Sequence, residues 1–456
     1  MSNALHIVIL AAGEGTRMKS SLPKVLQTVG GRPMLKHLLD TSAALEPRQI
    51  HVVIGSGAER VKEACSSYQV NWVIQSERRG TGHAVMQVMP DIPDDAAVLV
   101  LLGDHPMIPV SVLIEMIRKK PNPLSVLTME LEEPRGYGRI ERDRTGRISG
   151  VVEDRDATPA QWTIKEVNTG IILADSTALR RWLSQMGCDN FKHEYYLTDI
   201  FAMAHSEKSE IRGVLAPDSR DLQGANDRRQ LAVLEQRHRH HAAGKLMEQG
   251  VQIIDPDRLD VRGEVSVGQD VCIDINVIME GSNRLGDRVS VGPGVVLKNC
   301  DLAAGTRVHA YSVLEGVITT GDCDIGPFAR LRPGTQLAAG AKIGNFVEAK
   351  NAKVGEDSKA SHLSYLGDTV IGTRVNIGAG TITCNYDGAN KHQTIIEDEV
   401  FIGSDTQLVA PVTVGRGATI GAGSTITKNA PSDALTISRS RQTSFAGWTR
   451  PKKSEG

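Results

Sequence analysis

Aromatic residues are scarce in this 456-residue chain, where Phe, Trp and Tyr together make up 4%. The six cysteines, at positions 65, 188, 272, 300, 323 and 384, are scattered and include no CxxC pair. We therefore expect neither a disulfide framework nor a Cys-based zinc site, but free thiols in a reducing compartment. The formal net charge is −2, which gives no indication of nucleic acid or a charged membrane as the main partner.

Long apolar runs are also missing. The N-terminal run "LHIVILAA" is about eight residues, too short for a signal sequence or a membrane span. We expect a cytoplasmic protein without membrane insertion. The chain is too long for one ordinary hydrophobic core, so two domains are the first expectation.

The N-terminal half of the chain alternates strand and helix patterns. Short apolar runs at 6–10, 50–55, 71–75, 97–104 and 125–131 are typical of buried parallel strands, and the segment 33–45 has a helical pattern. This alternation predicts a doubly wound, Rossmann-like α/β domain over residues 1–225.

Residues 226–250 predict one helix that links two domains. Leu231 and Leu234 share a helical face with His238 and His241, and Gly250 ends the pattern. The histidines at 238, 240 and 241 resemble a metal cluster. No carboxylate or cysteine has matching spacing, so a solvated helix face is the favoured interpretation.

Residues 251–456 are distinguished by glycine and by regularly spaced apolar residues. The chain has 45 glycines, and every sixth residue is apolar in three stretches. These positions are Val267, Ile273, Met279, Leu285, Val291 and Leu297; Ile325, Leu331, Leu337 and Ile343; and Ile396, Ile402, Leu408, Val414, Ile420 and Ile426.

A six-residue period is typical of a left-handed parallel β-helix, with one short strand per hexad and the aliphatic side chain inside. Glycine often follows the aliphatic residue, as at Gly268, Gly286 and Gly403, where positive φ or close backbone approach is expected. Exposed edges and a narrow core favour association of several copies. A purely structural coil remains one interpretation of this half.

The first strand runs into "LAAGEGTRMKSSLPK", residues 10–24, a glycine-rich loop in the context that phosphate binding requires. Gly13 and Gly15 would let backbone N–H groups approach a pyrophosphate. Arg17 and Lys24 would supply positive charge to the oxygens in phosphoryl transfer.

A magnesium site is expected at the end of another strand. Asp104 follows a buried strand, where ligands of α/β domains bind. One carboxylate is a poor Mg²⁺ site, so Asn226 is the candidate second ligand, with phosphates and water completing the shell.

The order of these motifs resembles that of the sugar-nucleotide pyrophosphorylases. "GEGTRM" and "LPK" are followed by "GTGHA" (80–84), "LGD" (102–104), "GYGRI" (136–140), "VVED" (151–154) and "EVNTGI" (166–171). In related families the C-terminal coil is regulatory, as in ADP-glucose enzymes, or structural. In a third class it carries its own acyltransferase site.

A polar constellation favours the third class. Arg332, Lys350, His362 and Tyr365 lie in successive predicted coils. The basic pair would hold a sugar phosphate. His362 would take a proton from an amine that attacks a thioester, because an unperturbed imidazole titrates near neutrality.

Together these motifs resemble the bifunctional bacterial enzymes that are both glucosamine-1-phosphate N-acetyltransferase and N-acetylglucosamine-1-phosphate uridylyltransferase. The match extends from about residue 6 to 448, and "NIGAGTITCNYDGANK" is its most specific piece. The alternative is a single-function pyrophosphorylase with a structural or regulatory coil. A protein without activity in either reaction would be a scaffold.

The resemblance implies the following assignments. Leu10, Ala11, Ala12, Gly13, Lys24, Gln75, Gly80, Thr81, Leu102, Gly103, Asp104, Gly138, Glu153, Asn168 and Asn226 would bind the nucleotide sugar, with Mg²⁺ on Asp104 and Asn226. Arg332, Lys350, Tyr365 and Asn376 would bind the sugar phosphate, and His362 would be the base. Ala379, Asn385, Tyr386, Ser404, Ala422 and Arg439 would bind acetyl-CoA. UTP, glucosamine 1-phosphate and N-acetylglucosamine 1-phosphate are the other implied substrates, a homotrimer is the implied assembly, and supply of precursors for the bacterial envelope is the implied role.

Two residues depart from the family pattern, which more often has Tyr at position 102 and a small apolar residue at position 105. This chain has Leu102 and His105, both beside the expected metal site. The hexad pattern is also interrupted at 384–393. Since this segment carries Asn385 and Tyr386, we expect a loop that leaves the coil to cover the acyl donor.

Overall fold

The computed structural model describes residues 4–118, 123–190, 193–451 and 453. The chain divides into two compact units, one ending at His238 and the other beginning at Arg239. The division falls within helix α7 (Arg228–Glu248), which lies inside the segment 226–250 for which the sequence predicts one helix.

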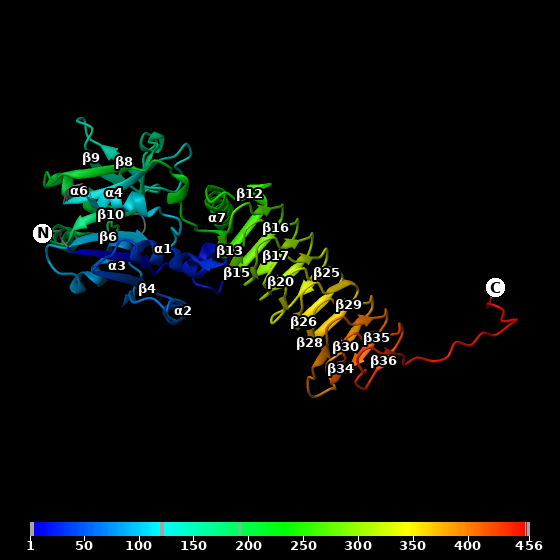
Figure 1. Ribbon diagram of the computed structural model, residues 1–456. Helices are drawn as coiled ribbons and strands as arrows, with labels where there is room; N and C mark the ends of the chain where they lie inside the picture. Colours follow the sequence, from blue (N-terminus) through cyan, green and yellow to red (C-terminus); the bar gives the residue numbers. More distant parts are fainter. Residues whose placement is uncertain (1–3, 119–122, 191–192, 452, 454–456) are drawn as a thin grey trace. The chain divides into compact units, whose positions relative to one another are not determined.

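The first unit is built on one mixed sheet, with nine strands among its described residues (Figure 1). The main order is β11-β7-β10-β6-β1-β4-β5, and β8 and β9 form a hairpin beside β10. The strands are β1 (Leu5–Ala11), β4 (Gln49–Ile54), β5 (Asn71–Ile74), β6 (Ala97–Leu102), β7 (Leu124–Glu130), β8 (Arg139–Arg142), β9 (Ile148–Val152), β10 (Glu166–Asp175) and β11 (Ile211–Leu215). The helices are α1 (Met34–Ala43), α2 (Ala58–Ala64), α3 (Thr81–Val88), α4 (Val110–Arg118), α5 (Ser176–Gln185) and α6 (Asp199–Ser206).

Strands β1, β4, β5 and β6 are parallel, as their continuous apolar character predicts. Strand β10 runs antiparallel to both β6 and β7. Its beginning therefore lies at the edge where β1 and β6 end, and it carries the "EVNTGI" motif to that edge.

Both faces of the central strands β1 and β6 are buried, which is why these two strands are apolar along most of their length. Ile7 and Ile9 of β1 pack in one core with α1, α2 and α4. Val8 packs on the opposite face with α3, α5 and α6. The expected doubly wound arrangement is confirmed.

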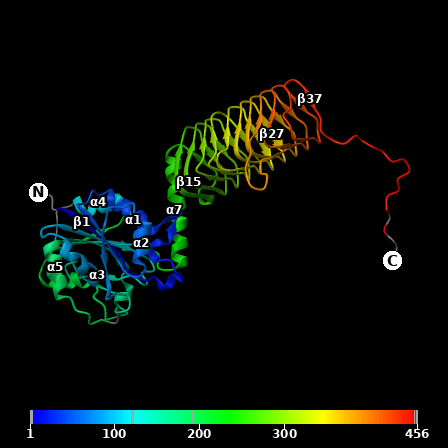
Figure 2. The same cartoon turned by 90° about the horizontal axis from the view of Figure 1, so that it is seen from below.

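The second unit is a parallel β-helix, as the hexads predict (Figure 2). One sheet contains β12 (Gln252–Ile253), β14 (Cys272–Ile273), β16 (Ser290–Val291), β19 (Arg307–Val308), β22 (Asp324–Ile325), β25 (Lys342–Asn345), β27 (Lys359–His362), β29 (Asn376–Ile377), β32 (Phe401–Ile402), β35 (Thr419–Ile420) and β37 (Leu435–Thr436). The other contains β13 (Leu259–Val267), β15 (Val277–Leu285), β17 (Val296–Lys298), β18 (Asp301–Leu302), β20 (Val313–Glu315), β21 (Ile318–Thr319), β23 (Arg330–Leu331), β24 (Gln336–Leu337), β26 (Glu348–Val354), β28 (Tyr365–Ile371), β30 (Ile382–Cys384), β31 (Thr394–Ile396), β33 (Gln407–Val409), β34 (Val412–Val414) and β36 (Thr425–Ile426).

The strand register explains why the hexads fall into three separate phases. Ile273 pairs with Val291 on the next coil, Val291 pairs with Val308, and Val308 pairs with Ile325. The first of these coils is three full hexads long, whereas the second and third are each shorter by a single residue. A shorter coil omits one corner residue and shifts the apolar positions that follow it. The phase therefore changes although the aliphatic ladder continues inside the coil.

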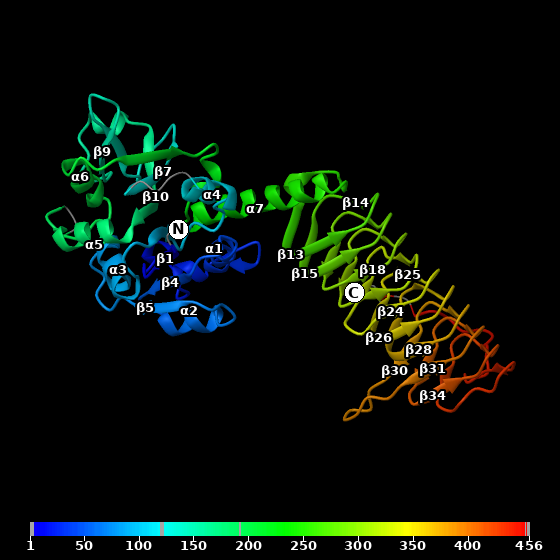
Figure 3. The ribbon, with the colours of Figure 1, turned by 60° about the vertical axis from the view of Figure 1, so that its left-hand side comes forward.

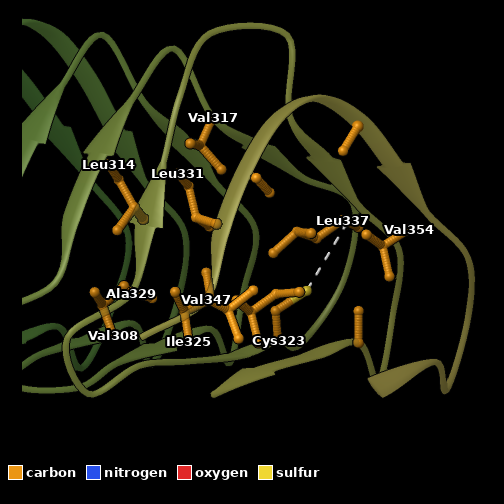
Figure 4. Close-up of a cluster of buried hydrophobic side chains, with 14 of the residues drawn as sticks. Val308, Leu314, Val317, Cys323, Ile325, Ala329, Leu331, Leu337, Val347 and Val354 are labelled. Carbon is orange, nitrogen blue, oxygen red and sulfur yellow. Dashed lines mark hydrogen bonds between the residues drawn. The ribbon is translucent and has the colours of Figure 1, made fainter. Parts of the chain in front are cut away.

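The interior of the coil is a stack of aliphatic side chains, of which Leu314, Leu331 and Leu337 are fully buried (Figure 4). Cys323 lies within this stack, and burial raises the pKa of its thiol to about 12. All six cysteines are free thiols, and Cys65 and Cys300 are buried as well.

The glycine at the coil corner is required for close approach rather than for positive φ. A Cβ atom at Gly286 would lie 2.6 Å from the backbone nitrogen of Ala304, and one at Gly403 would lie 2.5 Å from that of Ala422. The left-handed corner positions lie elsewhere and are often occupied by larger residues.

Three of these left-handed residues form an exposed aromatic ladder, which we define as Tyr311, Phe328 and Phe346. Successive ring centroids are 5.4 and 5.3 Å apart, with the rings nearly parallel. The side chains remain 57, 46 and 57% exposed, and all three φ angles are positive, at 57°, 56° and 55°. Bulky residues rarely adopt this conformation, because it costs backbone energy.

Helix α7 buries Leu231 and Leu234 in a small core with Met18, Val29 and Met34. Its histidines do not form a cluster. The ring of His238 packs against that of His37, whereas His240 Nδ1 lies 3.6 Å from Asp257 Oδ1. No group of three or more metal-ligating side chains occurs among the described residues. Within those residues, no helix has the length and apolar character needed to cross a membrane.

Candidate active sites

The residues of the first unit that are expected to bind a nucleotide sugar gather along one sheet edge. Leu10, Ala11 and Ala12 lie at the end of β1, and the N–H group of Gly103, just after β6, donates to the carbonyl of Leu10 (2.9 Å). A Cβ at Gly103 would lie 3.0 Å from that carbonyl oxygen, so a side chain there would separate the two strand ends.

The glycine-rich loop brings Lys24 to this edge. Gly15 has φ +64°, and a Cβ atom there would lie 2.5 Å from the Cβ of Lys24. Gly15 therefore serves both the turn and the approach of the lysine. Arg17 is exposed on the short helix η1 (Thr16–Met18).

Lys24 joins the two candidate metal ligands. Its ammonium group forms an ion pair with Asp104 and donates to Asn226 Oδ1 (2.7 Å). Burial alone would raise the pKa of Asp104, but electrostatic interaction with His105 and with Lys24 outweighs it and holds that pKa below its usual value. Asp104 is therefore ionised at neutral pH.

The same contacts show that these residues fit a magnesium ion. Two oxygens, one from a carboxylate and one from an amide, converge on a single position that the Lys24 ammonium contacts. Oxygen ligands of this kind suit Mg²⁺, which takes few protein ligands and keeps substrate phosphates and water.

The remaining candidate residues of this edge lie on loops and at the start of β10. Asn168 on β10 donates its backbone N–H to Gly138 (2.9 Å), and Thr198 Oγ1 donates to Glu153 Oε1 (3.1 Å). Gln75 follows β5 and donates through Nε2 to the carbonyl of Gly80 (3.2 Å). Thr81 begins α3, and its Oγ1 accepts from the N–H group of Leu197 (3.0 Å).

In the second unit, five residues occupy the same corner position in consecutive coils. Asn345 pairs with His362, and the register of the following strands places Ala379, Ser404 and Ala422 next. We call Asn345, His362, Ala379, Ser404 and Ala422 the corner column. Arg439 closes it by donating from Nη1 to the carbonyl of Ala422 (2.6 Å).

Asn345 orients the imidazole of His362. The Nδ1–H group of His362 donates to Asn345 Oδ1 at 2.7 Å, since an amide oxygen only accepts. The lone pair of the neutral ring is then on Nε2, so this nitrogen is the one that can take a proton.

A cationic patch lies on the next face of the coil. Lys350 pairs with Gly367, and its pKa is lowered by the neighbouring Lys391 and then by Arg332. Arg332 also donates to Glu348 (3.0 Å). Positive charges crowded in this way favour a phosphate.

Tyr365 and Asn385 complete this patch. A Cβ atom at Gly367 would lie 2.6 Å from the Tyr365 hydroxyl and 2.7 Å from Asn385 Nδ2, so both polar groups occupy the space that the glycine leaves open. Asn385 also donates to Asp368 (2.5 Å). A corner of the coil separates His362 from Tyr365. Asn376 lies on β29, which pairs with the strand that carries His362.

The interruption of the hexads is a projecting loop between β30 and β31 (Figure 3). Ile377 pairs with Ile402 on the next coil, so this coil exceeds its neighbours by more than a full hexad. Within the loop Tyr386 bridges to Lys391, and the Tyr386 side chain is 61% exposed. The loop therefore brings Lys391 to the cationic patch.

Each of the two units contains a region that matches a family of known proteins. Residues 7–139 match the MobA-like NTP transferase domain, and residues 393–428 match the bacterial transferase hexapeptide (six repeats). A Bifunctional protein GlmU from Xylella fastidiosa (strain M12) is 54% identical over 454 residues, which cover 99% of each chain. Proteins of the same name are 52% identical in Stenotrophomonas maltophilia (strain K279a), over 99% of this chain and 100% of that one, and 51% identical in Marinobacter nauticus (strain ATCC 700491 / DSM 11845 / VT8), over 98% and 99%.

The chain belongs to the GlmU family of bifunctional proteins. It is an enzyme with two activities, uridylyl transfer and acetyl transfer, and the prediction of a bifunctional enzyme is confirmed. The single-function pyrophosphorylase and the scaffold are not favoured.

The structure shows the surroundings of His105, the residue that departs from the expected family pattern. His105 is only 5% exposed and packs beside Asp104. Sequence reasoning noted the departure but assigned it no role.

Sequence reasoning also missed Asn345 and Lys391. Asn345 precedes His362 by one short coil, so the coil register is the signal that finds it. Lys391 lies in the interruption, where no register applies. Only the folded loop brings it to Lys350.

Proposed function

We propose that residues 1–225 catalyse uridylyl transfer, that residues 251–456 catalyse acetyl transfer, and that 226–250 link them. Acetyl passes from acetyl-CoA to the amine of glucosamine 1-phosphate. The phosphate oxygen of N-acetylglucosamine 1-phosphate then attacks the α-phosphorus of UTP, forming UDP-N-acetylglucosamine and pyrophosphate. The product would supply precursors for the bacterial envelope.

The Asn345–His362 hydrogen bond carries the acetyl-transfer assignment. His362 Nε2 accepts a proton from the amine nitrogen as that nitrogen attacks the thioester carbonyl. The C–S bond then breaks, and the imidazolium returns the proton to the sulfur, so that coenzyme A leaves as the thiol. Arg332, Lys350, Tyr365 and Asn376 bind the sugar phosphate. Lys391 adds a third cation to that group.

Acetyl-CoA binds along the corner column. From His362 to Ala422 the column spans three steps between coils, about 14 Å, and presents small side chains to an extended ligand. Ala379, Ser404 and Ala422 line it, Arg439 attracts the anionic end, and Asn385 and Tyr386 close over the donor from the loop.

Uridylyl transfer takes place at the sheet edge of the first unit. Leu10, Ala11, Ala12, Gly13, Gln75, Gly80, Thr81, Leu102, Gly103, Gly138, Glu153 and Asn168 bind the nucleotide sugar. Arg17 and Lys24 contact the phosphates. Asp104 and Asn226 hold Mg²⁺, which when bound reduces the negative charge on the phosphate oxygens.

Two assays in one chain test this division. His362→Ala should abolish thiol release from acetyl-CoA in the presence of glucosamine 1-phosphate, and should spare pyrophosphate release from UTP and N-acetylglucosamine 1-phosphate. Lys24→Ala should do the reverse. Acetyl transfer that survives in His362→Ala would refute the assignment of the base.

We further propose a cytoplasmic homotrimer. The exposed aromatic ladder supports it, because three stacked rings in a costly backbone conformation are otherwise left in water. Phe346→Asp should lower the mass measured by light scattering from three chains to one. An unchanged trimer would exclude the ladder from the interface.

A further inference from the structure

His105 occupies a position that links the two proposed magnesium ligands. Its side chain is 7% exposed, it follows Asp104 directly, and its Nε2 lies 3.8 Å from Asp104 Oδ1. That distance is too long for a hydrogen bond. Within the described part of the chain, the buried Nδ1 atom also has no hydrogen-bond partner. Hydrogen bonding therefore does not explain why a ring lies here.

Packing does explain it. A Cβ atom at Gly224 would lie 2.2 Å from His105 Cδ2 and 2.4 Å from Nε2, so the ring lies directly against the backbone of Gly224. The same Cβ would be 3.3 Å from Asp104 Cγ. The imidazole and the carboxylate thus pack against one glycine, and no residue other than glycine leaves room for both.

The segment that begins at Gly224 carries the second ligand. The N–H group of Ala225 donates to the carbonyl of Asp104 (3.2 Å), and Asn226 presents Oδ1 to Lys24. The backbone N–H of Asn226 donates to Gln230 Oε1 (2.7 Å) in the first turn of α7. This segment is therefore held by α7 at one end and by the Asp104–His105 pair at the other.

We propose that His105 is a positioning residue for the metal site: its ring, packed against Gly224, sets the separation between the Asp104 carboxylate and the Asn226 amide oxygen. The inference rests on the proposed role of these two residues as Mg²⁺ ligands. Mg²⁺ tolerates little variation in ligand distance, so a shift of the 224–226 segment weakens binding. Residues that orient metal ligands typically contribute about 10- to 100-fold in affinity.

A double-mutant cycle tests the packing directly. The variants are His105→Ala, Gly224→Ala and the double variant in the full chain, with Gly187→Ala as the matched control because a Cβ there meets no heavy atom within 4 Å. Mn²⁺ affinity, measured by electron paramagnetic resonance in the presence of UTP, is the main readout. The Mg²⁺ concentration for half-maximal uridylyl transfer is the second.

Each single change should weaken Mn²⁺ binding by about tenfold, since one removes the ring and the other displaces it. The double variant should be no weaker than His105→Ala, because removal of the ring makes room for the new methyl group. His105→Phe, which keeps a ring of similar size, should retain affinity within about threefold if packing is the mechanism. Gly187→Ala should behave as the unchanged protein.

Two outcomes would overturn the inference: Mn²⁺ affinity of His105→Ala within twofold of the unchanged protein, or single effects that multiply in the double variant. Asp104→Asn separates this inference from the proposed metal site. If Asp104→Asn binds Mn²⁺ normally, the metal ligands are wrong. If it loses the metal while His105→Ala does not, only the positioning role is wrong. Circular dichroism melting confirms that each variant folds.

Discussion

Replacement of Asn345 should reveal how His362 acts as a base. In the structure Asn345 Oδ1 accepts the Nδ1–H of His362 at 2.7 Å, which fixes the tautomer with its lone pair on Nε2. Asn345→Ala removes that acceptor. The ring is then free to turn and to carry its proton on either nitrogen.

The size of the effect follows from two contributions. Loss of a hydrogen bond of about 1 kcal/mol lowers the populated fraction of the productive tautomer severalfold. Misplacement of a catalytic group by about 1 Å costs up to about 100-fold in rate. We therefore expect acetyl-transfer kcat to fall by about 10- to 100-fold, with little change in the KM for acetyl-CoA, and uridylyl transfer to remain normal.

Asn345→Asp provides a matched variant that keeps an acceptor at the same place. It should restore most of the rate, and the acidic limb of the pH–rate profile should move up by about one pH unit, because a carboxylate stabilises the protonated ring. Thiol release from acetyl-CoA, followed from about pH 5.5 to 9 so that both limbs of the profile are covered, measures both quantities. If Asn345→Ala acetylates at the normal rate, or if Asn345→Asp leaves the profile unmoved, the orienting role is refuted.

Three further predictions concern the loop and two titratable groups, the buried His51 and the half-buried Asp199. Shortening the loop from Cys384 to His392 should cripple acetyl transfer and spare uridylyl transfer, and equal loss of both would show that the loop serves folding. Burial lowers the pKa of His51 to about 4, so its folded-state pKa lies below the unfolded value of 6.5 and stability is lost as pH falls from 6.5 toward 4. This loss of stability, about 3 kcal/mol, should be absent in His51→Gln. Midpoints of urea unfolding, measured as the pH is lowered from 6.5 toward 4, test the prediction. Burial and then the charge of Glu153 raise the pKa of Asp199 to about 6, so its ionisation costs stability as pH rises from 3.8 through 6. At neutral pH, Asp199→Asn should therefore be more stable than the unchanged protein, by about 1 kcal/mol after allowance for partial exposure of the carboxyl group. Its thermal unfolding midpoint should be higher, and an unchanged midpoint would contradict this prediction.

The fold was largely predictable because both halves obey simple periodicities. Continuous apolar strands require a sheet covered on two faces, and hexads require a coil. The reversal of β10 was not predictable in this way. Its apolar residues would be buried in either direction, so strand direction leaves no mark on the pattern.

The corner of the coil was predicted less well than its interior. Aliphatic positions are set by burial, which acts on each residue alone. Coils of three full hexads and coils that are one residue shorter differ only in an exposed corner residue. The change of phase along the sequence therefore shows where a residue is omitted, but not why it is omitted. The left-handed positions are held by residues such as Tyr311 and Phe328, which carry no intrinsic preference for that conformation.

Residues that act through neighbours were the hardest to find. Lys24, Asp104 and Asn226 come together at one sheet edge of the first unit. His105 and Gly224 pack together although they are far apart in the sequence. Neither residue type indicates in the sequence that the two are in contact. Such pairs become visible only once the backbone is in place.

The register of the coil also has a consequence for how this unit is made. Its strands pair with the equivalent strands of the adjacent coil, and even the widest step, from Ile377 to Ile402, joins consecutive coils. Contact order is therefore low for an all-β unit, whose pairings usually join distant segments. Each coil that leaves the ribosome finds a finished coil to pair with, so growth proceeds from the N-terminal end as synthesis continues. The corner column is therefore completed near the end of this growth, when the coil that carries Ala422 has been added and Arg439 follows it.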